Sequence, residues 1–213
     1  MRRLLLLRHA ITTETRRAAF PSTTGAATRD PCESLEPAGV NQARELAPHL
    51  PRIDRCWTSH ARRTLETAEA LGLKPEAALS ELAEGDFGRW AGRTLDEVHE
   101  KEPAELAAWF SNPASTPHGG EPLASIRARA AVVLMRAAAV PGTTLVITHG
   151  GLIRAAFLSV LDLQASTIWH VDCAPGSITE FHPSDEGWRL VRLNWTPTLT
   201  SPLRSRGAAP TDD

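Results

Sequence analysis

The sequence has no tyrosine, few cysteines and almost no net charge, and the last two of these features limit the classes of protein that it can belong to. The three cysteines, Cys32, Cys56 and Cys173, are odd in number and widely separated, which argues against a disulfide framework or a zinc ribbon. They suit a reducing compartment, so we expect a cytoplasmic protein. A net charge of −2 provides no positive field that would draw the chain onto nucleic acid or an acidic membrane, and we expect neither as a partner.

Long apolar runs are also missing. The run at residues 4–7 ends at Arg8 and His9, well short of the ~7–15 residues of a secretory signal core. No stretch approaches the ~20 apolar residues that cross a bilayer. The 213 residues are enough for one large domain with a sizeable core. We expect a single domain over residues 1–195, followed by a flexible tail at 196–213 that is polar and rich in proline and arginine.

Short apolar runs alternate along the chain with segments of helical spacing. Strands are indicated at 4–7, 55–59, 79–84 and 144–148, and helices at 37–50, 62–71, 94–110 with a break before Pro103, 123–140 and 150–161. Residues 177–181 and 188–195 are typical of a hairpin, and 12–31 and 111–122 of loops. This alternation implies parallel pairing with helices on both faces. The predicted fold is α/β, a three-layer α/β/α sandwich around a mostly parallel sheet with an antiparallel edge strand.

Groups that can handle phosphate follow three of the predicted strands. The first strand leads into Arg8 and His9, the second into Ser59 with Arg62 and Arg63 behind it, and the last into His149-Gly150-Gly151. Ligands of such sheets bind at the carboxyl ends of the strands. If these strands are neighbours, two histidines and at least one arginine meet at one place, with backbone N–H groups of helix N-termini beside them.

These residue types match the needs of phosphoryl transfer, which are a nucleophile, donors for the phosphoryl oxygens and an acid for the leaving oxygen. Neutral imidazole is a nucleophile near pH 7, and the arginine fork binds two phosphate oxygens at once. Glu84, at the end of the third predicted strand, is the candidate acid. A carboxyl group serves as an acid at neutral pH only where burial or nearby negative charge keeps it protonated, and an incoming phosphate would supply that charge.

Four segments, in order along the chain, resemble the motifs of the histidine phosphatases, also called the phosphoglycerate mutase superfamily. They are Leu6-Leu7-Arg8-His9 followed by Thr12, Ser59-His60-Ala61-Arg62-Arg63-Thr64-Leu65-Glu66-Thr67-Ala68, Glu84-Gly85-Asp86-Phe87-Gly88-Arg89-Trp90-Ala91-Gly92, and Val146-Ile147-Thr148-His149-Gly150-Gly151-Leu152-Ile153-Arg154. Glycine rather than aspartate after His149 resembles the mutase-like branch. Compact members of this branch include α-ribazole phosphatases, sugar phosphatases and broad-specificity enzymes.

The resemblance implies a phosphomonoester hydrolase that acts on a small phosphorylated metabolite without a metal ion or another cofactor. His9 would become phosphorylated, and Glu84 would protonate the leaving group and then activate water. The residues that would hold the phosphoryl group are Arg8, Arg63, His149 and Gly150. Thr12 and Thr15 are candidates for contacts with the substrate.

The sequence departs from the family pattern at four positions near these motifs. Ala10 replaces the glycine after the first histidine, and its methyl group crowds the loop behind the nucleophile. Thr15 stands where many members carry asparagine. Ile11 and His60 replace residues that are commonly glutamate and proline. None of these changes removes a catalytic group.

Phosphoglycerate mutase activity is the nearest alternative. By resemblance, true mutases carry a longer basic insertion after the proton donor, whereas residues 94–122 contain Lys101 as their one lysine or arginine. Hydrolysis is therefore favoured. A second alternative is a cysteine phosphatase, because Cys56 and Arg62 have the C-x5-R spacing, although the loop between them contains no glycine.

Two further alternatives remain. One is a degenerate family member that binds a phosphorylated partner without turnover, which Ala10 alone favours. The other is a metal hydrolase, which the eight histidines permit, although no HExxH or CxxC spacing occurs.

The choice of substrate is expected to depend on residues 12–31, 93–121 and 172–177. The first segment carries Arg16, Arg17 and Arg29, which could meet a second anionic group. Aromatic side chains in or near the second segment could wall a pocket or pack in the core; they are Trp90, Trp109 and Phe110. The oligomeric state is open, with a homodimer as one possibility.

Overall fold

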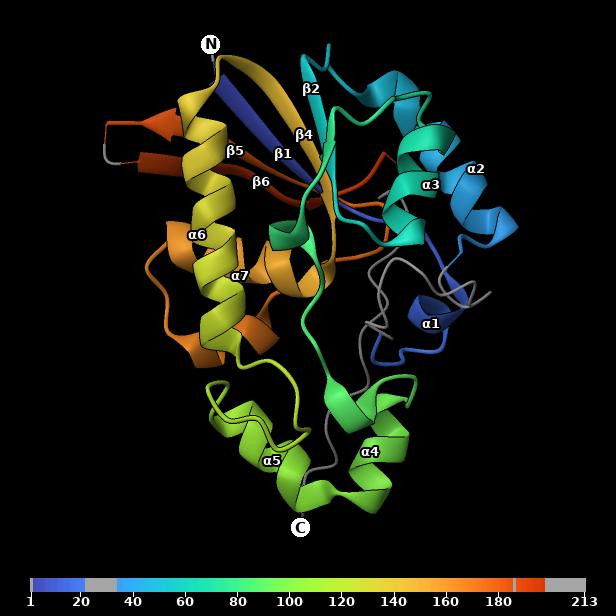
Figure 1. Cartoon of the computed structure of the whole chain (residues 1–213), viewed down its shortest axis with the longest axis vertical. Coiled ribbons are helices and arrows are strands. Elements are labelled where there is room, and N and C mark those ends of the chain that lie inside the picture. Colours follow the sequence, from blue (N-terminus) through green and yellow to red (C-terminus); the bar gives the residue numbers. More distant parts are fainter. Residues whose placement is uncertain (1, 22–33, 186, 198–213) are drawn as a thin grey trace.

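A six-stranded sheet runs through the centre of the molecule, with helices on both of its faces (Figure 1). The computed structural model describes residues 2–21, 34–185 and 187–197. The strands are β1 (Arg2–Arg8), β2 (Arg55–Thr58), β3 (Ala77–Ala78), β4 (Gly142–Thr148), β5 (Ile178–Ser184) and β6 (Gly187–Trp195). Their order is β3-β2-β4-β1-β5-β6; the first four are parallel, and β5 is antiparallel to both of its neighbours.

Helices cover the two faces of the sheet as expected for an α/β fold. The α-helices are α1 (Thr13–Arg16), α2 (Pro37–Leu46), α3 (Arg62–Ala70), α4 (Leu95–Lys101), α5 (Pro103–Ser111), α6 (Leu123–Ala139) and α7 (Gly150–Val160). Short 3-10 helices are η2 (Ala47–His49), η3 (Ser80–Leu82), η4 (Gly88–Trp90) and η5 (Ala165–His170). The predicted α/β sandwich with a mostly parallel sheet and an antiparallel edge strand is confirmed. In the described part of the chain, no helix is long and apolar enough to cross a membrane.

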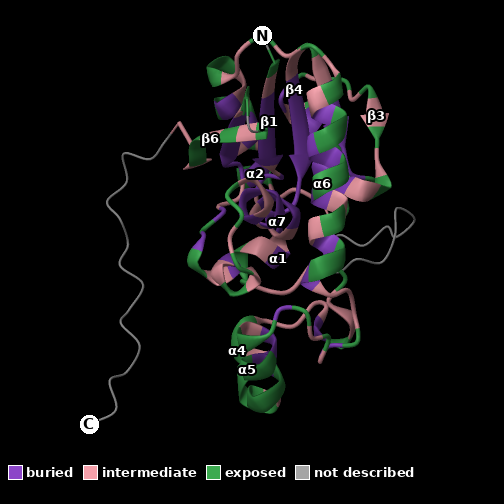
Figure 2. Ribbon diagram, turned by 90° about the vertical axis from the view of Figure 1, so that its left-hand side faces the viewer, coloured by how far each residue is buried: buried purple, intermediate pink, exposed green. Residues whose placement is uncertain are grey.

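The apolar run of β1 explains why this strand lies inside the sheet. Leu4 and Leu6 pack with α6 and α7 on one face, and Leu5 and Leu7 pack with α2 and α3 on the other. Side chains of a strand alternate between faces, so a run of four leucines fills both cores at once. Figure 2 shows the buried central strands between more exposed helices.

A small layer, here called the cap, lies beyond the carboxyl ends of the parallel strands and consists of η4, α4 and α5 (Figures 1 and 2). Its own core contains Trp90, Val98, Leu106 and Trp109. Thr94 starts α4 with a capping box that Glu97 completes, and Pro103 starts α5, as the predicted break requires.

Two of the predicted elements are wrong. Residues 79–84 do not form a strand: β3 is only Ala77–Ala78, and a 3-10 turn at Ser80–Leu82 follows it. β3 pairs with the last two residues of β2, and the Leu79 N–H still donates to the Thr58 carbonyl at 2.8 Å, but β2 ends there and the chain turns away. Residues 12–31 are not loop throughout, because α1 begins after the Thr12 cap. Residues 22–31 and the predicted tail beyond residue 197 lie outside the described residues.

Candidate active site

The carboxyl ends of β2, β4 and β1 meet at one edge of the sheet, since these strands are neighbours. Arg8 pairs in register with Thr148, and the His9 N–H donates to the Thr148 carbonyl at 2.9 Å. The Ser59 N–H donates to the carbonyl of Ile147 at 3.3 Å. Strand register therefore places the residues that follow each of the three strands beside one another.

The His9 imidazole is buried, with 3% of its surface exposed. Its Nδ1 lies 2.9 Å from the Ala10 carbonyl oxygen, which can only accept a hydrogen bond. Nδ1 therefore carries the proton in the neutral ring, and Nε2 keeps its lone pair. The backbone thus selects the tautomer that leaves Nε2 as the nucleophilic nitrogen.

A relay of hydrogen bonds holds the second imidazole, His149, whose ring centre lies 5.3 Å from that of His9. The Arg63 guanidinium donates to Nδ1 at 3.3 Å, so Nε2 carries the proton and donates to the Ser59 hydroxyl at 2.8 Å. Ser59 in turn contacts the Thr64 hydroxyl at 2.9 Å, and Thr64 donates to the Ala61 carbonyl at 2.7 Å. Along this buried relay each hydrogen bond has a defined donor and acceptor, and together these bonds fix the orientation of the His149 ring.

Both imidazoles are held in the neutral state. Burial, followed by the positive charges of Arg63 and Arg8, places the pKa of His9 well below its ordinary value of 6.5. Burial, followed by the positive charge of Arg63, lowers the pKa of His149 in the same way. The two rings are therefore uncharged at pH 7 in the absence of an anion.

Arg8 brings a guanidinium to the same place from the end of β1. It donates to the Cys173 carbonyl at 2.5 Å, and burial lowers its pKa. Its Nε is buried and has no hydrogen-bond partner among the described residues. Gly150 lies against it, because a Cβ there would be 3.5 Å from the Arg8 Cζ and Nε atoms. A buried donor beside the first turn of α7 is suited to an anion.

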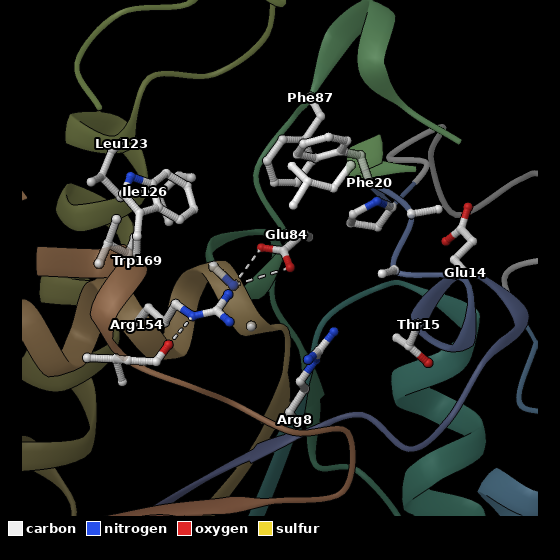
Figure 3. A pocket seen from close by; sticks show the side chains of 18 of the residues that line it. Arg8, Glu14, Thr15, Phe20, Glu84, Phe87, Leu123, Ile126, Arg154 and Trp169 are labelled. Carbon is white, nitrogen blue, oxygen red and sulfur yellow. Dashed lines mark hydrogen bonds between the residues drawn. The ribbon is translucent and has the colours of Figure 1, made fainter. Parts of the chain in front are cut away.

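Glu84 faces this cluster from the loop after η3 (Figure 3). Its carboxylate accepts hydrogen bonds from the Gly151 N–H at 3.1 Å and from the Gly85 N–H at 3.0 Å. A Cβ at position 151 would lie 2.3 Å from Glu84 Oε1, so only glycine permits this approach. The second glycine of the His149-Gly150-Gly151 motif therefore makes room for the carboxylate.

Arg154, the last residue of the fourth motif, also faces this cluster, although the motif alone implied no role for it. Figure 3 shows its guanidinium group close to the guanidinium group of Arg8 and to the carboxylate of Glu84. The Arg154 Nε donates to the Val171 carbonyl at 2.8 Å. Arg154 lies four residues after Gly150, which places both on one side of α7. The helical spacing was therefore a signal from which Arg154 could have been predicted.

These groups line one end of a cavity of about 420 Å³. The predicted site residues that line it are Arg8, His9, Thr12, Thr15, Arg63, Glu84 and Gly150. His149 lies behind His9 and Arg63 rather than in the wall itself. Thr12 and Thr15 also cap α1 through their side chains, so a structural role accounts for part of their placement. Trp109 and Phe110 line the cavity, whereas Trp90 is fully buried in the cap.

Other residues singled out in the sequence lie elsewhere. Arg62 is exposed and pairs with Glu66, while Arg63 is buried in the site. Arg16 pairs with Glu36 on the surface, and Arg29 lies outside the described residues. Ala10 is accommodated, because its methyl group packs in the core between the sheet, α2 and α3.

Cys56 does not have the properties of a cysteine nucleophile. It is buried within β2, and burial raises the pKa of its thiol to about 11. It is absent from the cavity wall. In the part of the chain that the structure describes, no three histidine, cysteine or acidic side chains are grouped to hold a metal ion.

Comparison with known proteins defines the class of protein. The model of the histidine phosphatase superfamily, branch 1, matches residues 4–196. Phosphoserine phosphatase 1 of Hydrogenobacter thermophilus is 30% identical over 171 residues, which cover 76% of this chain and 81% of that protein. Several other relatives, 31% identical over 206 residues, are longer, and the chain spans 53% of their length.

Solved structures agree with this assignment. A mycobacterial glucosyl-3-phosphoglycerate phosphatase is 26% identical, with a TM-score of 0.77 over 91% of this chain and 99% of that one. A putative α-ribazole-5′-P phosphatase of Escherichia coli shares the fold at 21% identity, with a TM-score of 0.76 over 91% of this chain and 96% of that one. The chain belongs to the histidine phosphatase superfamily, branch 1. It is an enzyme that hydrolyses phosphomonoesters.

Acidification should destabilise the fold, because His9 and His149 are buried in the neutral form. The pKa of each ring lies well below 6.5 in the folded chain, whereas the unfolded chain binds protons at histidine near that pH. Below pH 6.5 the unfolded state therefore holds more protons, and the free energy of unfolding falls by up to ~1.4 kcal/mol per pH unit for each ring. Urea unfolding from pH 7 to about pH 5 in phosphate-free buffer measures this slope.

The matched variants are His149→Asn, which should reduce the slope, and His60→Gln, at an exposed position, which should leave it unchanged. A slope that stays the same in His149→Asn would show that this imidazole is not held neutral.

Proposed function

We propose that the chain hydrolyses small phosphomonoesters in two steps, through a phosphohistidine formed on His9. The observation that carries this proposal is the neutral, buried His9, whose Nε2 lone pair remains available beside Arg8 and Arg63. The family assignment supports it as well. The mechanism uses no metal ion and no cofactor.

In the first step the phosphoryl group binds among Arg8, Arg63, His149 and the Gly150 N–H. For this contact the His149 proton moves to Nδ1, which donates to a phosphoryl oxygen, and the Ser59 hydroxyl turns to donate to Nε2. His9 Nε2 attacks phosphorus, the Nε2–P bond forms and the bond from phosphorus to the ester oxygen breaks. Protonated Glu84 gives its proton to the departing oxygen, so an alcohol leaves rather than an alkoxide. The guanidinium groups stabilise the negative charge on the equatorial oxygens.

In the second step water attacks the phosphohistidine. Glu84, now ionised, removes a proton from this water as the Nε2–P bond breaks, which releases phosphate and restores neutral His9 and protonated Glu84. The carboxylate is suited to both steps because backbone N–H groups of Gly85 and Gly151 hold it at the cavity. Thr12 and Thr15 are proposed to contact the substrate from the opposite wall.

A cytoplasmic location belongs to the same proposal, supported by Cys56 and Cys173, which are free thiols in the described chain. A homodimer stays a prediction, which light scattering of the purified chain would test.

Labelling with a radioactive phosphomonoester should trap phosphate on His9. Phosphohistidine survives alkaline quenching and is lost in acid, so the label should be base-stable and acid-labile. His9→Ala should abolish the label and lower kcat by at least ~10³-fold. The matched control, Cys56→Ser, should retain both the phosphate label and the unmodified kcat. A label that persists in His9→Ala would place the nucleophile elsewhere, and binding without turnover in the unmodified chain would indicate a non-catalytic homologue.

Glu84→Gln should slow esters of basic alcohols more than esters of acidic ones, because only the former need a proton on the leaving oxygen. We expect kcat for ethyl phosphate to fall by ~10²-fold or more and kcat for p-nitrophenyl phosphate by less than ~10-fold. Steady-state rates with both substrates measure the difference. An equal loss for both substrates would remove Glu84 from the role of proton donor.

A further inference from the structure

The end of the cavity away from the phosphate-binding groups is walled by aromatic rings (Figure 3). These rings come from separate parts of the chain; they are Phe20, Phe87, Trp109, Phe110 and Trp169. They contact one another: the ring centres of Phe20 and Phe87 are 5.1 Å apart, and those of Trp109 and Trp169 are 4.2 Å apart. The result is a continuous apolar wall joined to the phosphate site.

Packing of the cap explains some of these rings but not all of their surface. Trp109 is buried and belongs to the core of the cap, as Trp90 does. Phe20, Phe87 and Trp169 are only half-buried although they pack against that core. Their remaining surface faces the cavity, and half-buried aromatic surface inside a pocket favours an apolar group of a ligand.

The charges in the cavity wall are unequally distributed. Among described residues, its arginines are Arg8, Arg63 and Arg154. A Cβ at Gly150 would lie 3.4 Å from Arg154 and 3.5 Å from Arg8, so both guanidinium groups converge on the start of α7 and on the phosphate. The other charged side chains in the wall are carboxylates: Glu14, Glu84, Glu121 and Asp172. Glu121 is paired with Arg129. Among the described residues that line the rest of the cavity none is a lysine or arginine, so a second anion on the substrate would meet no cation there.

We propose that the preferred substrates are phosphate monoesters of uncharged alcohols that carry an apolar ring. The phosphate lies at His9, and the ring lies against Phe20, Phe87 and Trp169. This inference rests on the proposed phosphatase function and adds the chemical class of the alcohol to it.

Four primary alkyl phosphates test the proposal, because their leaving oxygens are chemically alike: ethyl phosphate, 2-phenylethyl phosphate, O-phosphoserine and 3-phosphoglycerate. We expect kcat/KM for 2-phenylethyl phosphate to exceed that for each of the others by at least ~10-fold, from burial of the phenyl ring. Equal values for ethyl and 2-phenylethyl phosphate, or a higher value for either anionic alcohol, would overturn the proposal. If the esters are hydrolysed with a different order of preference, the substrate proposal fails but the phosphohistidine mechanism does not. If none of the esters is hydrolysed, the proposed phosphatase function itself is refuted.

A variant pair locates the effect. Trp169→Leu should lower the ratio of kcat/KM for 2-phenylethyl phosphate to that for ethyl phosphate by at least ~5-fold. Trp188→Leu, a half-buried tryptophan on β6 outside the cavity wall, should leave the ratio unchanged. A ratio that is unaffected by Trp169→Leu would show that the ring does not bind there.

A separate observation, the contacts of Arg129 on α6, leads to a second inference. Arg129 donates to the backbone carbonyls of Glu81 at 2.9 Å and Ala83 at 2.7 Å, and reaches that of Glu84 at 3.4 Å. Its other N–H groups donate to the Glu121 carboxylate at 3.0 and 2.7 Å. All five N–H donors of the guanidinium are therefore used, and their direction is fixed.

The segment that carries Glu84 lacks strand partners, and side chains satisfy its carbonyls instead. Besides Arg129, the Thr148 hydroxyl donates to the Leu82 carbonyl at 2.7 Å. We infer that Arg129 is a positioning residue, which holds the backbone at residue 84 so that the carboxyl group meets the leaving oxygen. Glu121 orients Arg129 in turn.

Arg129→Gln should therefore reproduce the selective defect of Glu84→Gln, with kcat for ethyl phosphate falling at least ~10-fold and kcat for p-nitrophenyl phosphate less than ~3-fold. Arg136→Gln is the matched control, since Arg136 on the same helix binds the Glu81 side chain and should affect neither substrate. If Arg129→Gln does not fold, Arg129→Lys serves the same measurement. The double variant Arg129→Gln/Glu84→Gln should have the same kcat for ethyl phosphate as Glu84→Gln alone. Equal losses with both substrates, or additive losses in the double variant, would overturn the inference.

Discussion

The rest of this structure depends on one electrostatic interaction, between buried arginine side chains and two neighbouring imidazoles that must stay neutral. Arg8 and Arg63 lie at the carboxyl ends of neighbouring strands, and their charges together with burial lower the pKa of His9 and His149. Burial also lowers the pKa of Arg8 itself. Such a cluster is costly without an anion and favourable with one, because a phosphate offsets the charge and accepts the buried donors. The buried arginine charges therefore both attract phosphate and keep the nucleophilic His9 neutral.

The sheet makes this arrangement rigid. β1 lies between β4 and β5 and is buried on both faces, so the position of His9 follows from strand register rather than from a loop conformation. The backbone also sets the proton on the ring, since the Ala10 carbonyl accepts from Nδ1. The relay from Arg63 through His149 and Ser59 to Thr64 does the same for the second imidazole. Glu84 is the exception: it lies on irregular chain and depends on contacts from α6 and α7.

Sequence patterns were sufficient where one local feature decides the structure. The leucine run of β1 and the run in β4 predict buried strands, and the motif around residue 63 correctly separates buried Arg63 from exposed Arg62. The strand predicted at residues 79–84 failed because pairing depends on the length of β2, which the local pattern does not contain. Trp90 and Trp109 both pack in the core of the cap, yet only Trp109 also lines the cavity, and no sequence pattern distinguishes the two tryptophans. The i, i+4 spacing of Gly150 and Arg154 on α7 is a local signal for the position of Arg154. The contacts of Arg129 join segments far apart in the chain, so no local pattern predicts them.

The central claim is that two imidazoles and two guanidinium groups surround a single phosphoryl position. A crystal structure of the enzyme with orthovanadate, which imitates the transferring phosphoryl group, tests it most directly. We expect vanadium bonded to His9 Nε2, with vanadate oxygens within hydrogen-bond distance of Arg8, Arg63 and His149 and one oxygen facing Glu84. Vanadate bound away from His9, or bonded to another side chain, would contradict it.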